Sequence, residues 1–159
     1  MNLIPETNTN LYGYNDLFIS IKNMYDNEVM PNKIIFSGNK GIGKSTFAYH
    51  FINYIFSQNE DYKYDFKNNT ISPNNNSYNL IKNGSHPNFF LISSNNDKSN
   101  SQIAKIREMI NYTNKSSFNN SFKIILIDNI EYLNLNSINA LLKIIEEPNE
   151  KVLFLLIHD

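Results

Sequence analysis

The sequence predicts an α/β fold with a parallel, doubly wound sheet, and three observations support this prediction. Short apolar runs alternate with stretches that carry apolar residues at helical spacing, an order typical of parallel strands joined by crossover helices. A glycine-rich loop stands between the first of these runs and the helix expected after it. The third run, Phe122 to Asp128, is almost entirely apolar, as expected of a strand that is buried on both faces.

The first half of the chain should contain two helices around one strand. An amphipathic helix is expected at 15–29, and its apolar face should carry Leu17, Phe18, Ile21 and Met24. A short, buried strand is expected at 33–37, and a helix at 44–57. The polar connection at 58–87 should contain one short helix.

The second half should alternate more regularly. The expected elements are a strand at 88–93, a helix at 101–114, a strand at 122–128, a helix at 135–147 that Pro148 ends, and a strand at 151–157. Asparagine is abundant at 68–77 and 93–101. These two stretches are predicted to be solvated loops, with aggregation-prone behaviour as the alternative.

Composition excludes several classes of function. A chain of 159 residues corresponds to one domain, and 14 basic against 15 acidic side chains argue against independent nucleic-acid binding. The absence of cysteine excludes disulfides and thiolate metal sites, so no zinc is expected. The histidines are far apart in sequence, and structural roles are expected for them. Neither a signal peptide nor a membrane span is evident, which predicts a cytoplasmic protein.

The strongest motif is the loop "FSGNKGIGKSTF". Gly38, Gly43, Lys44 and Ser45 satisfy the phosphate-loop pattern G-x-x-x-x-G-K-[ST], between an expected strand and an expected helix. Lys44 should contact the β- and γ-phosphates of a nucleotide, and the Ser45 hydroxyl should bind Mg²⁺. The alternative is a glycine turn that fits the pattern by chance. The residues predicted to bind nucleotide are Gly38, Asn39, Lys40, Gly41, Ile42, Gly43, Lys44, Ser45 and Thr46.

An acidic residue ends the third expected strand. Asp128 should help Ser45 to hold the Mg²⁺ of a bound nucleotide, although it could be an ordinary strand terminus. Hydrolysis usually needs a further carboxylate as general base, and Asn129 occupies that position. Glu131 is expected to be a solvated or interface side chain. No catalytic residue is therefore assigned, and nucleotide binding with little hydrolysis is predicted.

Almost the whole chain resembles one protein family. "LYGYND", "MPNKIIFSGNKGIGKSTFAYHF", "GSHPNFFLIS", "IAKIREMI" and "KIILIDNIEYLNLNSINALLKIIEEPNEKVLFLLI" are similar to successive segments of the delta-prime subunit of the bacterial DNA polymerase III clamp loader, an AAA+ family related to the tau/gamma ATPase subunits. The resemblance implies a P-loop, three-layer fold. Residues 1–159 would form an AAA+ nucleotide-binding domain that is incomplete after the fourth core strand, without the lid and the C-terminal collar.

The resemblance also implies a role in DNA replication. The chain would be an ATP-binding subunit of a DNA polymerase holoenzyme, with ATP and Mg²⁺ as ligands and weak ATPase activity of its own. Its partners would be tau/gamma-type and delta-type subunits, the sliding clamp and, through the complex, primer-template DNA. The family's serine-arginine-cysteine motif and its four-cysteine zinc module are not found in this sequence. The alternatives are an independent P-loop ATPase or kinase, or a truncated non-functional remnant.

Overall fold

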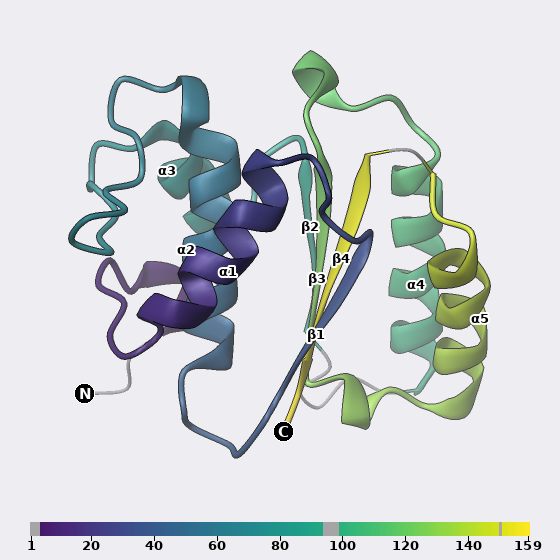
Figure 1. The fold of residues 1–159 in the computed structure, drawn as a ribbon. Coiled ribbons are helices and arrows are strands. Elements are labelled where there is room, and N and C mark those ends of the chain that lie inside the picture. Colours follow the sequence, from purple (N-terminus) through teal and green to yellow (C-terminus); the bar gives the residue numbers. More distant parts are fainter. Residues whose placement is uncertain (1–3, 94–98, 150) are drawn as a thin grey trace. The chain divides into compact units, whose positions relative to one another are not determined.

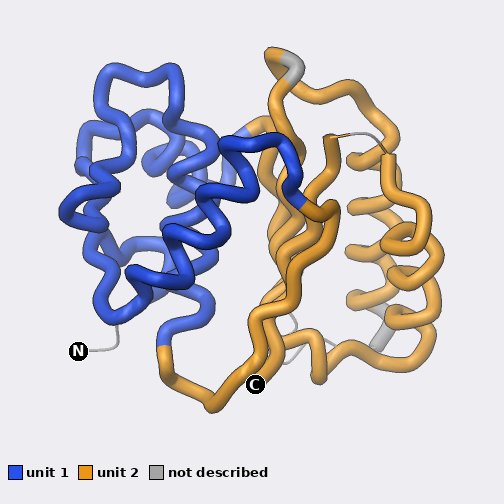
Figure 2. The backbone as a smooth tube through the Cα atoms, viewed as in Figure 1, with its two compact units in different colours: residues 1–30, 43–86 blue, residues 31–42, 87–159 orange. Residues whose placement is uncertain are grey.

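The computed structural model describes residues 4–93, 99–149 and 151–159. Two compact units make up the chain (Figure 2). Unit 1 contains residues 1–30 and 43–86, and unit 2 contains residues 31–42 and 87–159. Each unit is described by itself, so the expectation of one domain over residues 1–159 stays a prediction.

Unit 2 is built on a parallel sheet (Figure 1). Its strands are β1 (Lys33–Ser37), β2 (Phe89–Ser93), β3 (Lys123–Asp128) and β4 (Val152–His158). Their order is β1-β4-β3-β2, and all three pairings are parallel. The α/β class, the parallel sheet and all four strands expected from the sequence are thereby confirmed, each with bounds within one residue of the expected ones.

The position of a strand in the sheet determines its burial. The central strands β3 and β4 are buried along almost their whole length, as the apolar run at 122–128 predicts. Strand β1, in contrast, is an edge strand, and within it only Phe36 is buried while Ile35 is 63% exposed. The expectation of a buried strand at 33–37 is therefore wrong in burial, because sequence pattern cannot distinguish an edge strand from a central one.

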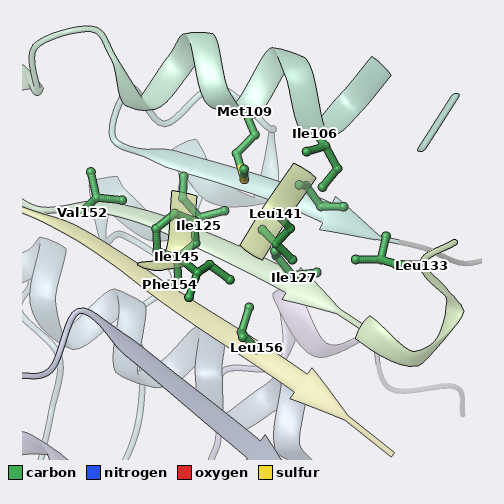
Figure 3. Close-up of a cluster of buried hydrophobic side chains, with 11 residues drawn as sticks. Ile106, Met109, Ile125, Ile127, Leu133, Leu141, Ile145, Val152, Phe154 and Leu156 are labelled. Atoms are coloured by element: carbon green, nitrogen blue, oxygen red, sulfur yellow. The ribbon is translucent and has the colours of Figure 1, made fainter. Parts of the chain in front are cut away.

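Two helices cover one face of this sheet. Helix α4 (Ser99–Thr113) and helix α5 (Leu135–Glu146) match the expected helices within two residues. Short 3₁₀ turns, η3 (Phe118–Asn120) and η4 (Ile130–Tyr132), flank β3. Apolar side chains, most of them aliphatic, from both helices, three strands and the turn before α5 meet in a buried cluster (Figure 3), whose members are Ile92, Ile106, Met109, Ile125, Ile127, Leu133, Leu141, Ile145, Val152, Phe154 and Leu156.

Unit 1 consists of helices and irregular chain. Its elements are η1 (Pro5–Thr7), α1 (Asn15–Asp26), α2 (Lys44–Phe56), η2 (Ser57–Asn59) and α3 (Asn76–Lys82). The core is aromatic. The ring of Phe18, which is fully buried, lies within 5.2–6.1 Å of the rings of five others: Phe47, Phe51, Tyr54, Tyr64 and Phe66.

Helix α1 is shorter and its buried face narrower than the sequence predicts. Only Phe18 and Ile21 are buried in it, whereas Leu17 is 46% and Met24 is 41% exposed. The helix ends at Asp26 because the N–H of Glu28 bonds to the Tyr25 carbonyl and the N–H of Val29 to the Met24 carbonyl. These two bonds form a Schellman motif, with Glu28 in the left-handed position that glycine usually occupies.

The Asn-rich stretch 68–77 is not a solvated loop. Ile71, Asn75 and Ser77 are all buried, and Asn75 is the N-cap of α3, because its side chain accepts a hydrogen bond from the N–H of Tyr78. The one short helix predicted within 58–87 is confirmed as α3. Of the second Asn-rich stretch, residues 94–98 lie outside the described residues, and residues 99–101 form the first turn of α4.

Candidate functional site

The glycine-rich loop has the backbone conformation that its sequence predicts. Gly41 (φ 84°) and Gly43 (φ 94°) are in the left-handed region, which side chains with a Cβ rarely adopt. A Cβ on Gly43 would meet nothing closer than 3.6 Å, so its left-handed backbone, and not crowding, favours glycine at this position. Glycine is therefore required here by backbone angle.

Helix α2 begins directly after this loop. Gly43 is its N-cap, and the Gly43 carbonyl accepts the first intrahelical hydrogen bond from the N–H of Phe47 at 2.9 Å. No acidic residue lies in the first turn, which contains Lys44, Ser45 and Thr46. A helix N-terminus carries partial positive charge and attracts anions. This terminus adds an ammonium group and two hydroxyl groups to that charge, which is the donor set that suits a phosphate and its bound cation.

The nine predicted binding residues are divided between the two units. Gly38, Asn39, Lys40, Gly41 and Ile42 belong to unit 2, and Gly43 to Thr46 belong to unit 1. In the first part Lys40 and Ile42 are exposed, whereas in the second Lys44 is buried, with 6% of its surface exposed. The proposal that all nine residues surround one nucleotide stays a prediction.

The carboxyl end of β3 carries the other predicted site residues. Asp128 ends β3 and is half-buried, and its neighbour Asn129 is left-handed (φ 58°, ψ 61°). Asn129 caps the turn η4, where its carbonyl accepts a hydrogen bond from the N–H of Tyr132 at 3.1 Å. Asparagine tolerates this backbone region better than most residues. Asn129 therefore has a backbone role in addition to its amide chemistry.

Glu131 is exposed within η4, as expected of a solvated side chain. Asp128 and Ser45 lie in different units. Their joint role in holding Mg²⁺ accordingly stays a prediction. Within the described ranges, no group of three or more histidine or acidic side chains is arranged to hold a metal ion without help from a ligand.

One polar residue at this edge was not assigned to the site from the sequence. His158 is the last residue of β4, and the strand register pairs it with Ser37, the residue before Gly38. The Ser37 hydroxyl lies 3.4 Å from His158 Nδ1. Ligands bind at the carboxyl ends of parallel strands, so a histidine at such an end could have been assigned to the site from the sequence. It was not assigned because the strand was predicted to end at Ile157, one residue before the histidine.

The other two histidines are in unit 1 and have structural contacts. His50 is fully buried in α2, and its Nε2 donates to the Asn8 carbonyl at 3.0 Å, so that Nδ1 is left to accept from the Tyr64 hydroxyl, also at 3.0 Å. Desolvation lowers the pKa of His50 to about 4. Desolvation also lowers the pKa of His86, which stacks on Phe56, to about 4. Both are neutral at physiological pH.

A parallel α/β sheet whose first strand leads into a G-x-x-x-x-G-K-S loop and a helix defines the phosphate-loop class of proteins. The sequence of residues 13–159 matches the family described as "DNA polymerase III, delta subunit". The chain belongs to this family, whose members are clamp-loader-type subunits of DNA polymerase III. The resemblance found in the sequence motifs is thereby confirmed.

Several curated relatives are named as subunits of DNA polymerase III. The chain is 33% identical over 134 residues to the delta' subunit of DNA polymerase III from Buchnera aphidicola subsp. Baizongia pistaciae, covering 80% of this chain and 38% of that protein. It is 27% identical over 154 residues to the tau/gamma subunit from Haemophilus influenzae, covering 96% and 21%. It is 28% identical over 78 residues to the delta' subunit from Pseudomonas aeruginosa, covering 49% and 24%.

A solved structure is also similar. It is the crystal structure of a DNA polymerase III gamma subunit-related protein from Thermotoga maritima, with 25% identity, a TM-score of 0.40, and coverage of 45% of this chain and 24% of that chain. The chain thus spans well under half the length of the relatives it matches. None of the helices in the described part of the chain is long and apolar enough to cross a membrane.

Proposed function

We propose that this chain is an ATP-binding clamp-loader subunit of the delta-prime type, which acts in DNA replication with little ATP hydrolysis of its own. One observation carries the proposal. An intact phosphate loop, with left-handed Gly41 and Gly43, opens α2 in a chain of the DNA polymerase III delta subunit family. A loop that had lost its role would have no chemical reason to keep the glycines, the lysine and the hydroxyl together.

The loop residues would have separate roles. The N–H groups between Gly38 and Lys44 would donate to phosphate oxygens, and the Lys44 ammonium would neutralise charge on the β- and γ-phosphates. Ser45 and Asp128 would supply oxygen ligands to Mg²⁺. Bound Mg²⁺ would neutralise part of the triphosphate charge. The residues fit this ligand because the first turn of α2 contains no acidic side chain to oppose it.

Hydrolysis should be slow because the general-base position holds an amide. The Asn129 side chain cannot accept a proton from water at neutral pH, and general-base assistance is worth roughly 10²–10⁴-fold in rate. Arginine supplied in trans by a neighbouring subunit can add about 10³–10⁵-fold in related phosphoryl transfers. The chain alone would therefore bind nucleotide and turn it over little.

The partners would be tau/gamma-type and delta-type subunits, the sliding clamp and, through the complex, primer-template DNA, in the cytoplasm. The near-neutral composition, with 14 basic and 15 acidic residues, supports a role in which other subunits supply most of the DNA contact.

Calorimetry with MgATP tests nucleotide binding. Lys44→Ala should weaken binding at least about tenfold, because it removes a charge-assisted phosphate contact worth about 1.5–3 kcal/mol. Lys82→Ala is the matched control, since Lys82 is an exposed lysine in the last turn of α3, in the same unit as Lys44 but outside the loop. Equal affinity of the wild type and Lys44→Ala, or no binding by a folded wild type, would refute the proposal.

Steady-state phosphate release tests the hydrolysis claim. The isolated chain should release phosphate far more slowly than once per second, and Asn129→Glu should raise the rate only modestly because the arginine is still missing. Size-exclusion chromatography with tau/gamma-type and delta-type subunits tests assembly. Rapid turnover by the chain alone, without partners, would favour an independent ATPase.

A further inference from the structure

Unit 2 contains a polar cavity at the amino end of the sheet. It has a volume of about 480 Å³ and lies between the C-terminal end of α4, the amino end of β3 and the turn before β4. Parallel strands carry the loop 38–42 and Asp128 at their carboxyl ends, so this cavity is at the opposite edge of the sheet from those residues. Its volume falls within the roughly 300–1,000 Å³ range of small-ligand pockets.

Positive charge and hydroxyl groups dominate the lining. The lining residues are Thr113, Asn114, Lys115, Ser116, Ser117, Lys123, Asn149, Lys151 and Val152. Three of them are lysines, three carry hydroxyl groups, and none of these described lining residues is acidic. Because the lining contains no aromatic ring and Val152 is its one aliphatic side chain, it offers nothing on which a nucleobase could stack. The chemistry suits a small, hydrophilic anion.

Side-chain hydrogen bonds hold the walls of the cavity in place. The Lys123 ammonium is buried and donates to the carbonyls of Tyr112 and Lys115 at the end of α4. It also lies over the Tyr112 ring, 4.5 Å from the centroid. The Asn149 amide donates to the Thr113 carbonyl and to the Asn114 side chain, both at 3.1 Å. The cavity is thus a built feature of the fold and does not depend on one mobile side chain.

Lys115 and Lys123 leave positive charge uncompensated at this place. Among the residues that the structure describes, no carboxylate lies within 4 Å of the ammonium group of Lys115 or of Lys123. Burial, together with the positive charge of Lys115, lowers the pKa of Lys123. Lys123 donates to carbonyls at the end of α4. Lys115 and Lys151 are exposed residues that line the cavity.

We propose that this cavity binds a small phosphate-bearing anion, with Lys115 and Lys151 as its charged contacts and Ser116 and Ser117 as hydroxyl donors. Lysine and hydroxyl groups are common ligands of phosphate oxygens. A small anion fits better than a nucleic acid, because a duplex presents a convex backbone whereas these donors surround a hollow. The proposal does not depend on nucleotide binding at the glycine-rich loop.

An NMR titration that follows each backbone amide distinguishes binding at this cavity from binding at the glycine-rich loop. The ¹⁵N-labelled chain is titrated with inorganic phosphate, and separately with pyrophosphate, against chloride at matched ionic strength. Saturable shifts are expected at the amides of residues 113–117 and 151–152. Shifts confined to residues 38–46 would overturn this proposal and leave the proposed function intact. A 12-base-pair duplex that shifts the cavity amides when phosphate and pyrophosphate do not would also overturn it.

Matched substitutions complete the test. The double variant Lys115→Gln/Lys151→Gln should weaken phosphate binding at residues 113–117 by about tenfold or more, because it removes two charge-assisted contacts. Lys143→Gln, which removes an exposed lysine in the last turn of α5, should leave binding unchanged. Dispersed amide spectra confirm that both variants fold. Equal weakening by the double variant and by Lys143→Gln would show a general charge effect and overturn the proposal.

Discussion

Unit 1 and unit 2 bury their cores with different chemistry. In unit 2 the core is an aliphatic cluster between a parallel sheet and two helices. In unit 1 it is a group of aromatic rings around Phe18, surrounded by buried polar residues such as His50, Asn53 and Asn75. Both units belong to one short chain, and the buried polar residues of unit 1 have a structural cause.

The cause is how each unit satisfies its backbone. Sheet pairing satisfies the N–H and C=O groups of the strands in unit 2, which leaves side chains free to be purely apolar. In unit 1 the segment from Ser57 to His86 is irregular apart from η2 and α3, and side chains there satisfy backbone groups that a sheet would otherwise pair. The Ser57 hydroxyl accepts from the N–H of Tyr64, and the Asn75 amide donates to the Tyr62 carbonyl. The irregular backbone therefore requires buried polar side chains in addition to the aromatic core.

The largest expected effect on stability comes from removing one buried phenylalanine ring from either core. Phe18→Ala and Phe154→Ala should each lower the free energy of unfolding by about 3–5 kcal/mol, since both rings are fully buried. Substitution by leucine should distinguish the two cores, because it should lower the free energy of unfolding more at Phe18 than at Phe154. Phe18→Leu loses ring contacts worth about 0.5–1.5 kcal/mol each, whereas Phe154 packs among aliphatic side chains. Urea denaturation that shows equal costs for the two leucine variants would contradict the comparison.

Acid should weaken unit 1 selectively. The folded-state pKa of His50 is about 4, below its unfolded value near 6.5, so the unfolded chain binds more protons between these pH values. Stability from neutral His50 is full above pH 6.5 and is lost as pH falls toward 4, by up to about 3 kcal/mol. Desolvation lowers the pKa of His86 to about 4 as well, so His86 adds a loss of the same sign.

Amide hydrogen exchange between pH 7 and 4.5 measures this effect, after correction for the intrinsic exchange rate. Protection should fall more at residues 47–56 in unit 1 than at residues 123–128 in unit 2. His50→Gln should flatten the pH dependence while it lowers stability at pH 7. An unchanged slope in that variant would mean that another group titrates.

Two asparagine N-caps allow a closer comparison. Asn134 caps α5 in unit 2, where its side chain accepts from the N–H of Ser137 at 2.9 Å. Asn75 caps α3 in unit 1 and also accepts from the buried Asn53 amide at 2.8 Å. Asn134→Ala should cost about 1 kcal/mol, because Gln102 Oε1 loses the Asn134 side-chain amide but keeps the hydrogen bond from the Asn134 backbone N–H. Asn75→Ala should cost about 2–4 kcal/mol, because it also leaves a buried amide without its acceptor. Thermal unfolding that ranks them in the opposite order would contradict this account.

The smallest expected effects concern left-handed residues. Glu28 in unit 1 (φ 58°) occupies the Schellman position after α1, and Asn129 in unit 2 has the same φ. Glu28→Gly should stabilise the protein by about 0.5–1 kcal/mol, because glycine relieves backbone strain. Asn129→Gly should be neutral within about 0.5 kcal/mol, since asparagine tolerates this region, and Asn129→Glu should cost about 1 kcal/mol. Chemical denaturation of the three variants measures these differences.

The sequence by itself determined the order of the helices and strands, most of their bounds, the parallel sheet, the family and the left-handed glycines of the phosphate loop. The reason is that each depends on local pattern: β-branched runs, helical spacing, and the backbone angles that Gly41 and Gly43 supply. Only the tertiary structure decided the burial of residues whose position in the sheet or whose hydrogen bonds the sequence pattern does not show. It exposes Ile35 at a sheet edge and buries Asn75 beneath a turn. It also aligns His158 with Ser37. These facts depend on which strands pair and on where an irregular backbone needs a hydrogen bond, and contacts between residues far apart in the chain leave no signal in a short stretch of sequence.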